Sequence, residues 1–386
     1  MLNIFGQQHG GFCDRRSRRN FIKIGALGLG GLSLPQLLRA QKETGTGRSN
    51  KAIIMIYLPG GPPHQDMYDL KMDAPSNVRG EFSPISTKVP GIRICEHLPR
   101  MAAMADKLVF VNSLVGSIGQ HASFQCTTGR SSNNQPAGGW PELGTVISRL
   151  QGGEKETVPS YINLSPKMKH SPYNFGKNSF VGVSHRAFMP LGDTKSDMTL
   201  QGITMERLED RRRLLKSFDG LRRNLDASGM MEGMDAFQEE AFDLLTSSRL
   251  LEALDLSKED PKIRERYGKG TSKVQGDAAP RMNEQFLVAR RLVEAGARVV
   301  TVSYSFWDWH GSNFARAKEN FPDFDQALTA LVEDLHQRGM ADDTTVIAWG
   351  EFGRMPTINK NAGRDHWPRV ANALLACGGM RTGQVI

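Results

Sequence analysis

The chain has 386 residues, of which 39% are hydrophobic, 23% charged and 8% aromatic. This composition excludes a disordered, collagen-like or disulfide-scaffold protein, and the lack of any apolar run of about 18 residues excludes a multi-pass membrane protein. The formal net charge is +8, but the first 40 residues carry +5 of it, because six basic side chains there outnumber one acid. The remaining residues carry only +3, so we expect no nucleic-acid binding. Because no apolar run is long enough, we also expect no stable membrane span.

The first 40 residues resemble a twin-arginine export signal. The sequence SRRNFIK at residues 17–23 matches that motif at nearly every position, and an uncharged, glycine-rich run follows at 24–34. Such signals are addresses read by a receptor rather than membrane anchors. We therefore expect recognition by the twin-arginine export machinery and a location in the periplasm or cell envelope, with a polar linker at 41–50. The alternative interpretation is a basic tail before a short helix.

Strand and helix patterns follow the linker. The apolar run at 52–58 (AIIMIYL) predicts a buried strand that ends at a Pro-Gly-Gly turn, and 108–111 (LVFV) predicts the next strand, after a short helix at 98–105. Residues 203–280 begin with charged segments that have leucines at near-helical spacing, which predicts a helical insertion.

The alternation continues after residue 282. It predicts a helix ending at Gly296, a strand at 298–303 (RVVTVS), a helix capped by Asp323, and a strand at 344–349 (TTVIAW). Strands and helices joined by short connections form mainly parallel sheets, whose ligand sites lie at the carboxyl ends of the strands. The predicted fold class is therefore α/β.

Clusters of carboxylate and imidazole side chains follow three of these strands. The clusters contain His64 and Asp66, then Asp308 and His310, and finally Glu351 with His366 in the next loop. In an extended segment, residues i and i+2 share a face, so each Asp–His pair presents both groups together. A carboxylate beside an imidazole suits a divalent metal such as zinc or manganese, although single residues of this kind are commonly ordinary loop residues.

Two arginines lie near the same clusters. Arg354 and Arg364 either hold an anionic group such as phosphate, sulfate or carboxylate, or form salt bridges with Glu351 or Asp365. The sequence leaves both interpretations open.

The order of these segments resembles the bacterial exported family known as domain of unknown function 1501, a branch of the alkaline phosphatase/sulfatase superfamily. The matching segments are 60–62 with Asp66 and Asp69, His121 before 128–129, 289–296, 307–310, 349–354 and 363–368. The resemblance covers residues 50–386. It implies an alkaline phosphatase/sulfatase-like three-layer sandwich at 51–386, with a mainly parallel central sheet, the helical insertion, and a C-terminus that lacks some family residues.

Superfamily members hydrolyse phosphate or sulfate esters with one or two divalent metals. The resemblance therefore implies a zinc, manganese or calcium ion bound by Asp66, Asp308, His310 and His366. It further implies that Glu351 acts as ligand or base, that His121 transfers a proton, and that Arg354 or Arg364 binds an anionic ester or glycan substrate.

Two departures from the superfamily pattern favour a second hypothesis. Phe352 stands where the superfamily has a metal-binding histidine, and no nucleophile aligns clearly before Thr128. The first hypothesis is an exported, metal-dependent hydrolase of sulfate or phosphate esters. The alternative is a non-catalytic envelope binding protein on a decayed alkaline phosphatase-like fold. An oxidoreductase is disfavoured because no G-x-G-x-x-G motif opens the first helix.

Overall fold

A seven-stranded sheet lies at the centre of the structure, a computed structural model that describes residues 50–152, 158–176, 179–191 and 248–386. The strand order is β13-β4-β12-β9-β1-β8-β5. These strands are β1 (Ala52–Tyr57), β4 (Leu108–Leu114), β5 (Tyr161–Asn163), β8 (Val299–Ser303), β9 (Thr344–Trp349), β12 (Ala371–Cys377) and β13 (Gln384–Val385). The expected signal peptide, the linker up to residue 49, and residues 203–247 of the insertion expected at 203–280 lie outside the described residues.

The sheet is mainly parallel, as predicted. β1 pairs in parallel with β8 and β9, β8 with β5, and β4 with β13. Only β12 runs antiparallel to its neighbours β4 and β9 among the strands of this sheet in the described residues. β1 is buried along most of its length because it lies in the middle of a sheet covered on both faces, which explains its continuous apolar sequence.

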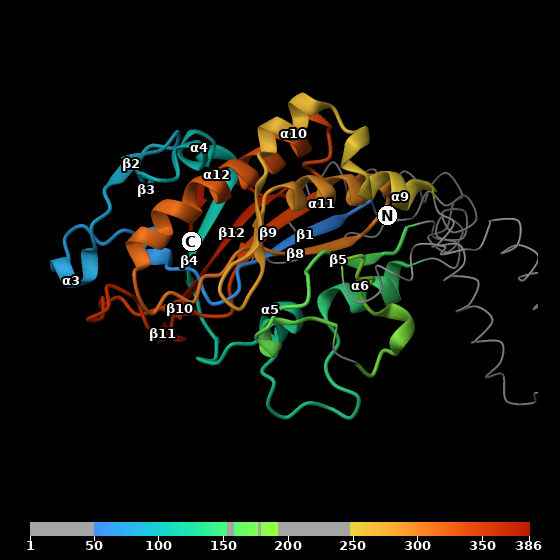
Figure 1. Ribbon diagram of the computed structural model, residues 1–386, viewed down its shortest axis with the longest axis horizontal. Coiled ribbons are helices and arrows are strands. Elements are labelled where there is room, and N and C mark those ends of the chain that lie inside the picture. The colour runs from blue at the N-terminus through green and yellow to red at the C-terminus, as the bar shows by residue number, and fades with distance from the viewer. Residues whose placement is uncertain (1–49, 153–157, 177–178, 192–247) are drawn as a thin grey trace, which may run out of the picture. The chain divides into compact units, whose positions relative to one another are not determined.

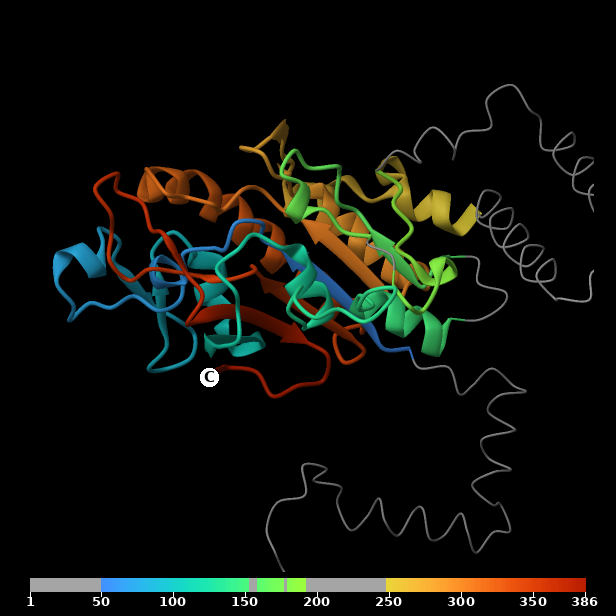
Figure 2. The same cartoon turned by 90° about the horizontal axis from the view of Figure 1, so that it is seen from below.

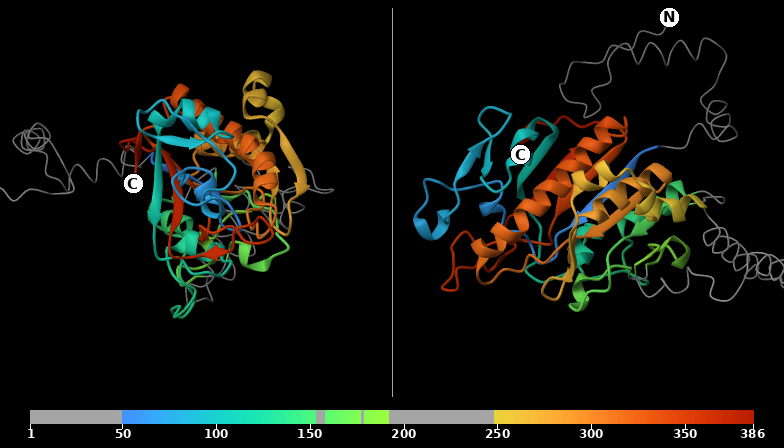
Figure 3. Two further views of the ribbon diagram at one scale, coloured as in Figure 1. Left: turned by 90° about the vertical axis from the view of Figure 1, so that its left-hand side faces the viewer. Right: turned by 45° about the horizontal axis from the view of Figure 1, so that its top comes forward.

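Helices cover both faces of the sheet, so the predicted three-layer sandwich is confirmed (Figure 1). α11 packs on β1 and β8, and α12 packs on β12, with α9 and α10 on the same side (Figure 3). α5 and α6 lie on the opposite side, where α6 packs on β5 and β8 (Figure 2). The helices are α3 (Ser76–Arg79), α4 (Pro99–Ala103), α5 (Ser123–Thr128), α6 (Leu143–Gln151), α9 (Ser248–Leu254), α10 (Pro261–Tyr267), α11 (Glu284–Ala295) and α12 (Asn313–Gln337).

Short elements complete the described chain. Three two-stranded ribbons are formed by β2 (Pro84–Ser86) with β3 (Arg93–Cys95), β6 (Gly270–Val274) with β7 (Pro280–Met282), and β10 (Gly353–Arg354) with β11 (His366–Trp367). The 3-10 helices are η1 (His64–Asp66), η2 (Ala105–Lys107), η3 (Ser171–Tyr173), η4 (Val183–His185) and η6 (Leu256–Lys258). Within the described ranges, no helix is both long enough and apolar enough to cross a bilayer.

Helix α12 is longer than the sequence predicts. It begins at Asn313 rather than at Asp323 and continues through Pro322, which usually ends or kinks a helix. Pro322 is exposed, whereas Phe314, Ala317 and Phe321 are buried in the core. Burial of this apolar face outweighs the amide hydrogen bond that proline cannot make.

The loops after β1, β8 and β9 leave the same edge of the sheet because these three strands are parallel neighbours. The first two loops touch closely at Gly60, which has φ +107°. A Cβ atom there would lie 2.3 Å from the backbone nitrogen of Asp308. Glycine is therefore required at this position, and it brings the first loop against the chain that carries the Asp–His pair.

A buried ion cluster joins α10, α11 and α12. The Arg290 side chain is 1% exposed, and its guanidinium lies 2.5 Å from a carboxylate oxygen of both Glu259 and Glu294 and 2.9 Å from one of Asp334. The Tyr267 hydroxyl also donates to Asp334, at 2.9 Å. The 289–296 segment that carries part of the family resemblance therefore has a structural role on the face of the sheet that α11 and α12 cover.

Candidate metal centre

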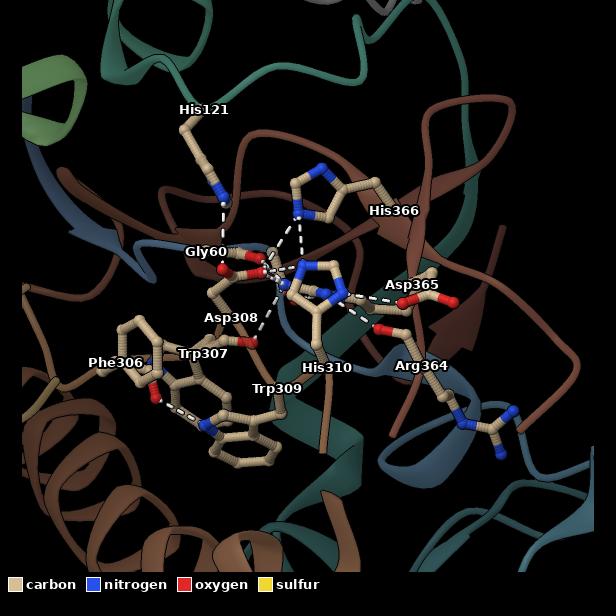
Figure 4. Close-up of polar contacts among 12 residues, drawn as sticks. Gly60, His121, Phe306, Trp307, Asp308, Trp309, His310, Arg364, Asp365 and His366 are labelled. Carbon is tan, nitrogen blue, oxygen red and sulfur yellow. Dashed lines mark hydrogen bonds and ion pairs between the residues drawn. The ribbon is translucent and has the colours of Figure 1, made fainter. Parts of the chain in front are cut away.

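Asp308 is surrounded by three histidines that come from segments far apart in the sequence (Figure 4). Its Oδ1 atom lies 3.0 Å from Nε2 of His310 and 3.1 Å from Nε2 of His366. Its Oδ2 atom lies 3.3 Å from Nε2 of His121. The side chains of His121 and His366 are 15% and 23% exposed and that of His310 is 46% exposed, so solvent reaches the cluster.

The outer nitrogen of each ring faces a hydrogen-bond acceptor. The pairs are His121 Nδ1 with Glu351 Oε1 at 2.8 Å, His310 Nδ1 with Asp365 Oδ1 at 2.7 Å, and His366 Nδ1 with the Gly119 carbonyl at 2.9 Å. We therefore assign the hydrogen of each neutral ring to Nδ1, which leaves the Nε2 lone pairs facing Asp308. Metal-binding histidines are held in this way by carboxylates and carbonyls behind them.

This arrangement fits a bound cation. The Nε2 atoms of His310 and His366 are only 3.1 Å apart, and two lone pairs repel at that distance unless a proton or a cation lies between them. Zinc bonds to nitrogen and oxygen are about 2.0–2.2 Å long, so tetrahedral ligand atoms lie about 3.3 Å from one another. Ligand atoms of His121, Asp308 and His366 also lie within 4.8 Å of one another.

Electrostatics at the cluster also favour a cation. Burial alone would raise the pKa of Asp308, but the rings of His121 and His366, which donate to it when they are protonated, and the Arg354 guanidinium hold this pKa far below its usual range. Burial alone would lower the pKa of His121, but its hydrogen bonds with Asp308 and Glu351 and the charges of those carboxylates raise it to about 9. Asp308 is therefore ionised at neutral pH, and the cluster holds a proton readily where no other cation compensates its negative charge.

Glu351 is placed behind His121 rather than among the three Nε2 atoms. Its side chain is 1% exposed and accepts hydrogen bonds from the Gly60 amide at 3.0 and 3.1 Å and from the Tyr57 hydroxyl at 3.1 Å. Burial and the Glu351 charge raise the pKa of Tyr57 well above its ordinary value, so its hydroxyl stays a donor. The carboxylate is thereby fixed in position to orient the His121 ring.

Phe352 packs against the histidines instead of adding a ligand. Its ring centroid lies 4.2 Å from that of His366 and 5.2 Å from that of His121, and the residue is 1% exposed. The aromatic ring shields one side of the cluster from water, which strengthens the electrostatic interactions there.

Asp66, an expected metal ligand, forms a salt bridge with an arginine instead of facing the histidines. Its carboxylate forms a paired interaction with Arg364, from Nε to Oδ2 at 2.7 Å and from Nη2 to Oδ1 at 2.7 Å, and also accepts from Asn313 Nδ2 at 2.8 Å. Asp66 and Arg364 are 1% and 0% exposed. The structure therefore gathers His121, Asp308, His310 and His366 around one point but places Asp66 apart from them.

Both arginines are engaged by the protein. Arg364 also donates to the backbone carbonyls of Val78, Met355 and Pro356. Arg354 is 1% exposed, lies 2.5 Å from Asp308 Oδ1, and donates to the carbonyls of Gly60, Gly61, Trp307 and Arg364. These contacts join the loops after β1, β8 and β9 to one another and leave neither guanidinium open to a substrate.

Replacing Arg364 with alanine should weaken both the fold and the metal centre. Removing one partner of a buried ion pair typically costs about 3–5 kcal/mol, because Asp66 would keep an uncompensated charge. Loosening the segment that carries His366 should also lower metal affinity by about 10–100-fold, as is typical when support behind a ligand is lost. Denaturant unfolding and metal titration measure the two effects, with exposed Arg369 replaced by alanine as the control. Unchanged metal affinity would show that the pair does not support the site.

Several partners in this cluster have no clear signal in the sequence. Tyr57 belongs to an apolar strand, and Gly119 contributes only a backbone carbonyl. Tyr173, whose hydroxyl lies 3.2 Å from Nδ1 of His121, ends the short helix η3 and belongs to no motif. Asp365 directly precedes His366, but the sequence offers it only as a possible salt-bridge partner of Arg354 or Arg364, and in the structure it contacts His310 instead. Contacts made through the backbone or across distant loops are set by the tertiary fold.

An α/β sandwich with a histidine–carboxylate cluster at the carboxyl edge of its sheet is the class of protein that the fold and the site define. The chain belongs to the family described as "Protein of unknown function (DUF1501)", whose family model matches residues 50–386. A search of curated proteins found no match.

Solved structures with a similar fold include three proteins of low sequence identity. The lipoteichoic acid synthase LtaP of Listeria monocytogenes is 10% identical, with 88% of this chain and 68% of that chain covered and a TM-score of 0.34. The phosphonate monoester hydrolase SpPMH of Silicibacter pomeroyi is 10% identical, with 88% and 70% covered and a TM-score of 0.37. The C-terminal periplasmic domain of EcEptC of Escherichia coli, in complex with Zn, is 11% identical, with 86% and 74% covered and a TM-score of 0.35.

Proposed function

We propose that this chain is an exported, metal-dependent hydrolase of sulfate or phosphate esters. The observation that supports it most strongly is the convergence of three Nε2 atoms on Asp308, each from a ring whose Nδ1 is held from behind. The twin-arginine motif supports export, and the family resemblance supports ester hydrolysis.

Asp308, His310 and His366 are the ligands we propose for a single divalent ion. Their nearest ligand atoms lie 3.0–3.1 Å from one another. Two imidazoles and one carboxylate favour zinc or manganese, whereas calcium prefers oxygen ligands alone. A divalent ion held there supplies a Lewis acid that polarises an ester oxygen. Asp66 is not part of this set, because Arg364 and Asn313 occupy its carboxylate oxygens.

His121 and Glu351 form the proton-transfer pair of the proposal. Glu351 holds Nδ1 of His121 at 2.8 Å, which directs Nε2 toward Asp308 and the open side of the cluster. When a bound cation compensates the charge of Asp308, a carboxylate that orients an imidazole in this way lets the opposite nitrogen accept a proton from an attacking water or hydroxyl group. The buried Gly60 and Tyr57 contacts keep Glu351 in place during that transfer.

Metal removal tests the proposal. Purified mature protein should contain about one zinc or manganese ion per chain by mass spectrometry, and should hydrolyse members of a panel of aryl and sugar sulfates and phosphates. Dialysis against a chelator should abolish turnover, and adding the metal back should restore it. His121→Gln should keep the metal but lose about 10²–10⁴-fold in kcat, as is typical when a general acid or base is removed.

The contrary results are equally specific. Protein without stoichiometric metal and without turnover on the whole panel would exclude the hydrolase. Loss of the ion in His121→Gln would make His121 a ligand instead of a proton acceptor.

The alternative is a non-catalytic envelope binding protein, and Phe352 is the observation that favours it. Its ring fills the space beside His366 and His121 where a further ligand would be expected. Stoichiometric metal with no turnover on any ester, together with binding of an anionic glycan in calorimetry, would support this second function.

A further inference from the structure

The histidines of the metal centre continue into a row of four rings. Neighbouring ring centroids are 4.7 Å apart for His310 and His366, 4.6 Å for His366 and His121, and 5.2 Å for His121 and His170. The first three rings have an Nε2 atom beside Asp308, whereas His170 extends the row by one ring. Its side chain is 34% exposed, so it is more accessible than His121 and can meet a ligand.

His170 has a carboxylate partner of its own. Its Nδ1 atom lies 3.7 Å from Oδ2 of Asp277, and its backbone amide donates to the Asp277 carbonyl at 3.0 Å. His170 with Asp277 is therefore a third imidazole–carboxylate pair in the row, beside His121 with Glu351 and His310 with Asp365. It is more exposed than the neighbouring His121–Glu351 pair, since Asp277 is 47% exposed and Glu351 only 1%.

The loop that carries His170 is fixed to the cluster. Asn174 braces it from within, accepting from the Met168 amide at 2.8 Å and donating to the Met168 carbonyl at 3.0 Å. Ser123 of α5 donates to the Asn174 carbonyl at 2.8 Å, which ties the loop to the helix that follows His121. The Tyr173 hydroxyl also lies 3.2 Å from Nδ1 of His121. The position of His170 beside His121 is thus set by contacts on both sides.

We propose that His170, positioned by Asp277, is the residue that meets the leaving-group oxygen of the ester and gives it a proton. The inference rests on the proposed function, since it assigns a role within the same reaction. Arg354 and Arg364 are engaged by the protein, so among the described residues around Asp308 the imidazoles of this row are the groups available to contact a substrate beside the ion. His121 faces Glu351 and Asp308. His170 is therefore the imidazole of the row that remains to contact the leaving group.

The proton balance of this step needs two separate groups. The bond from phosphorus or sulfur to the leaving oxygen breaks with its electron pair on that oxygen, which takes the Nε2 proton of His170. A water oxygen forms the new bond, and one of its protons moves to Nε2 of His121. One water is consumed, one alcohol and one phosphate or sulfate are released, and solvent returns the proton from His121 to His170.

The dependence of rate on leaving group tests this role. His170→Ala should lower kcat/KM for alkyl phosphates or sulfates by about 10²–10⁴-fold, because an alkoxide is a poor leaving group without a proton. The same variant should change kcat/KM for 4-nitrophenyl esters by less than about threefold, because nitrophenolate leaves without help. Asp277→Asn should show the same pattern at smaller size, and His185→Ala, which alters a partly buried histidine outside the row, should show neither loss. Metal content and melting temperature should stay at the wild-type values in all three variants.

Equal losses on both classes of ester, or no loss on either, would overturn the proposal while leaving the hydrolase itself standing. A second measurement does not need turnover. Diethylpyrocarbonate should modify His170 in the wild-type holoprotein, phenylphosphonate should protect it, and His185 should not be protected, as read by peptide mass spectrometry. Protection without hydrolysis would keep the contact and exclude the reaction, and His170 left unprotected while His310 is protected would exclude the contact.

Discussion

Asp308→Asn is expected to lower metal affinity by at least about 100-fold and to abolish ester turnover with it. Asparagine keeps the shape of the side chain but removes the charge that three imidazoles and the Arg354 guanidinium share. The loss should exceed the 10–100-fold typical of changes behind the ligands, because Asp308 itself faces every Nε2 atom of the cluster. Competition with a chromogenic chelator measures the affinity, and mass spectrometry counts the ion.

The control for this variant is Asp342→Asn, which removes the charge of an exposed aspartate without touching the cluster. It should bind metal as the wild type does. Wild-type affinity in Asp308→Asn would mean that the ion lies elsewhere, and the proposed centre would be wrong. Unfolding of the variant is followed by circular dichroism, since Arg354 would lose its buried counter-ion.

Arg290→Met is expected to destabilise the fold by about 3–5 kcal/mol, the usual cost of breaking a buried ion pair from one side. Methionine fills much of the space but removes the most buried of the cations beside Glu259 and Asp334, which keep the more exposed Arg291 and Arg338. The effect appears in the midpoint of urea unfolding. The folded fraction should bind metal normally, because Arg290 contacts none of the residues around Asp308.

Lys262→Ala serves as the matched control, since it removes a positive charge from the exposed side of neighbouring α10. It should change the free energy of unfolding by no more than about 0.5 kcal/mol. A similar small change in Arg290→Met would show that the ion cluster is stabilised by other contacts. Charge reversal at Glu259 should then also be tolerated.

The sheet could be predicted because its strands are continuous apolar runs. β1 is buried on both faces and reads as an apolar run, whereas β9 alternates buried and half-buried residues. β12 (Ala371–Cys377) is not predicted from the sequence, although two glycines follow it, because its antiparallel pairing with β4 and β9 forms only in the folded chain. The start of α12 was missed because Pro322 suggests an interruption, and only the burial of Phe314 and Phe321 shows that the helix begins earlier.

The site could be anticipated only as a region. Spacing after strands identifies Asp308 and His310, and they do lie together with His366. Spacing does not reveal that Asp66 is 2.7 Å from Arg364, because a carboxylate near a metal site and a carboxylate in a salt bridge have the same local sequence. The choice between them depends on loops brought together across the sheet edge.

Arg354 and Arg364 have a consequence for how the proposed centre would bind an ion. Their guanidinium groups bind backbone carbonyls from all three loops, so the scaffold around Asp308 is already braced by permanent positive charges. A divalent ion that binds there would displace protons from the cluster. It would cause little movement of the three loops. Metal binding would therefore change the charge at this edge of the sheet far more than the positions of its loops.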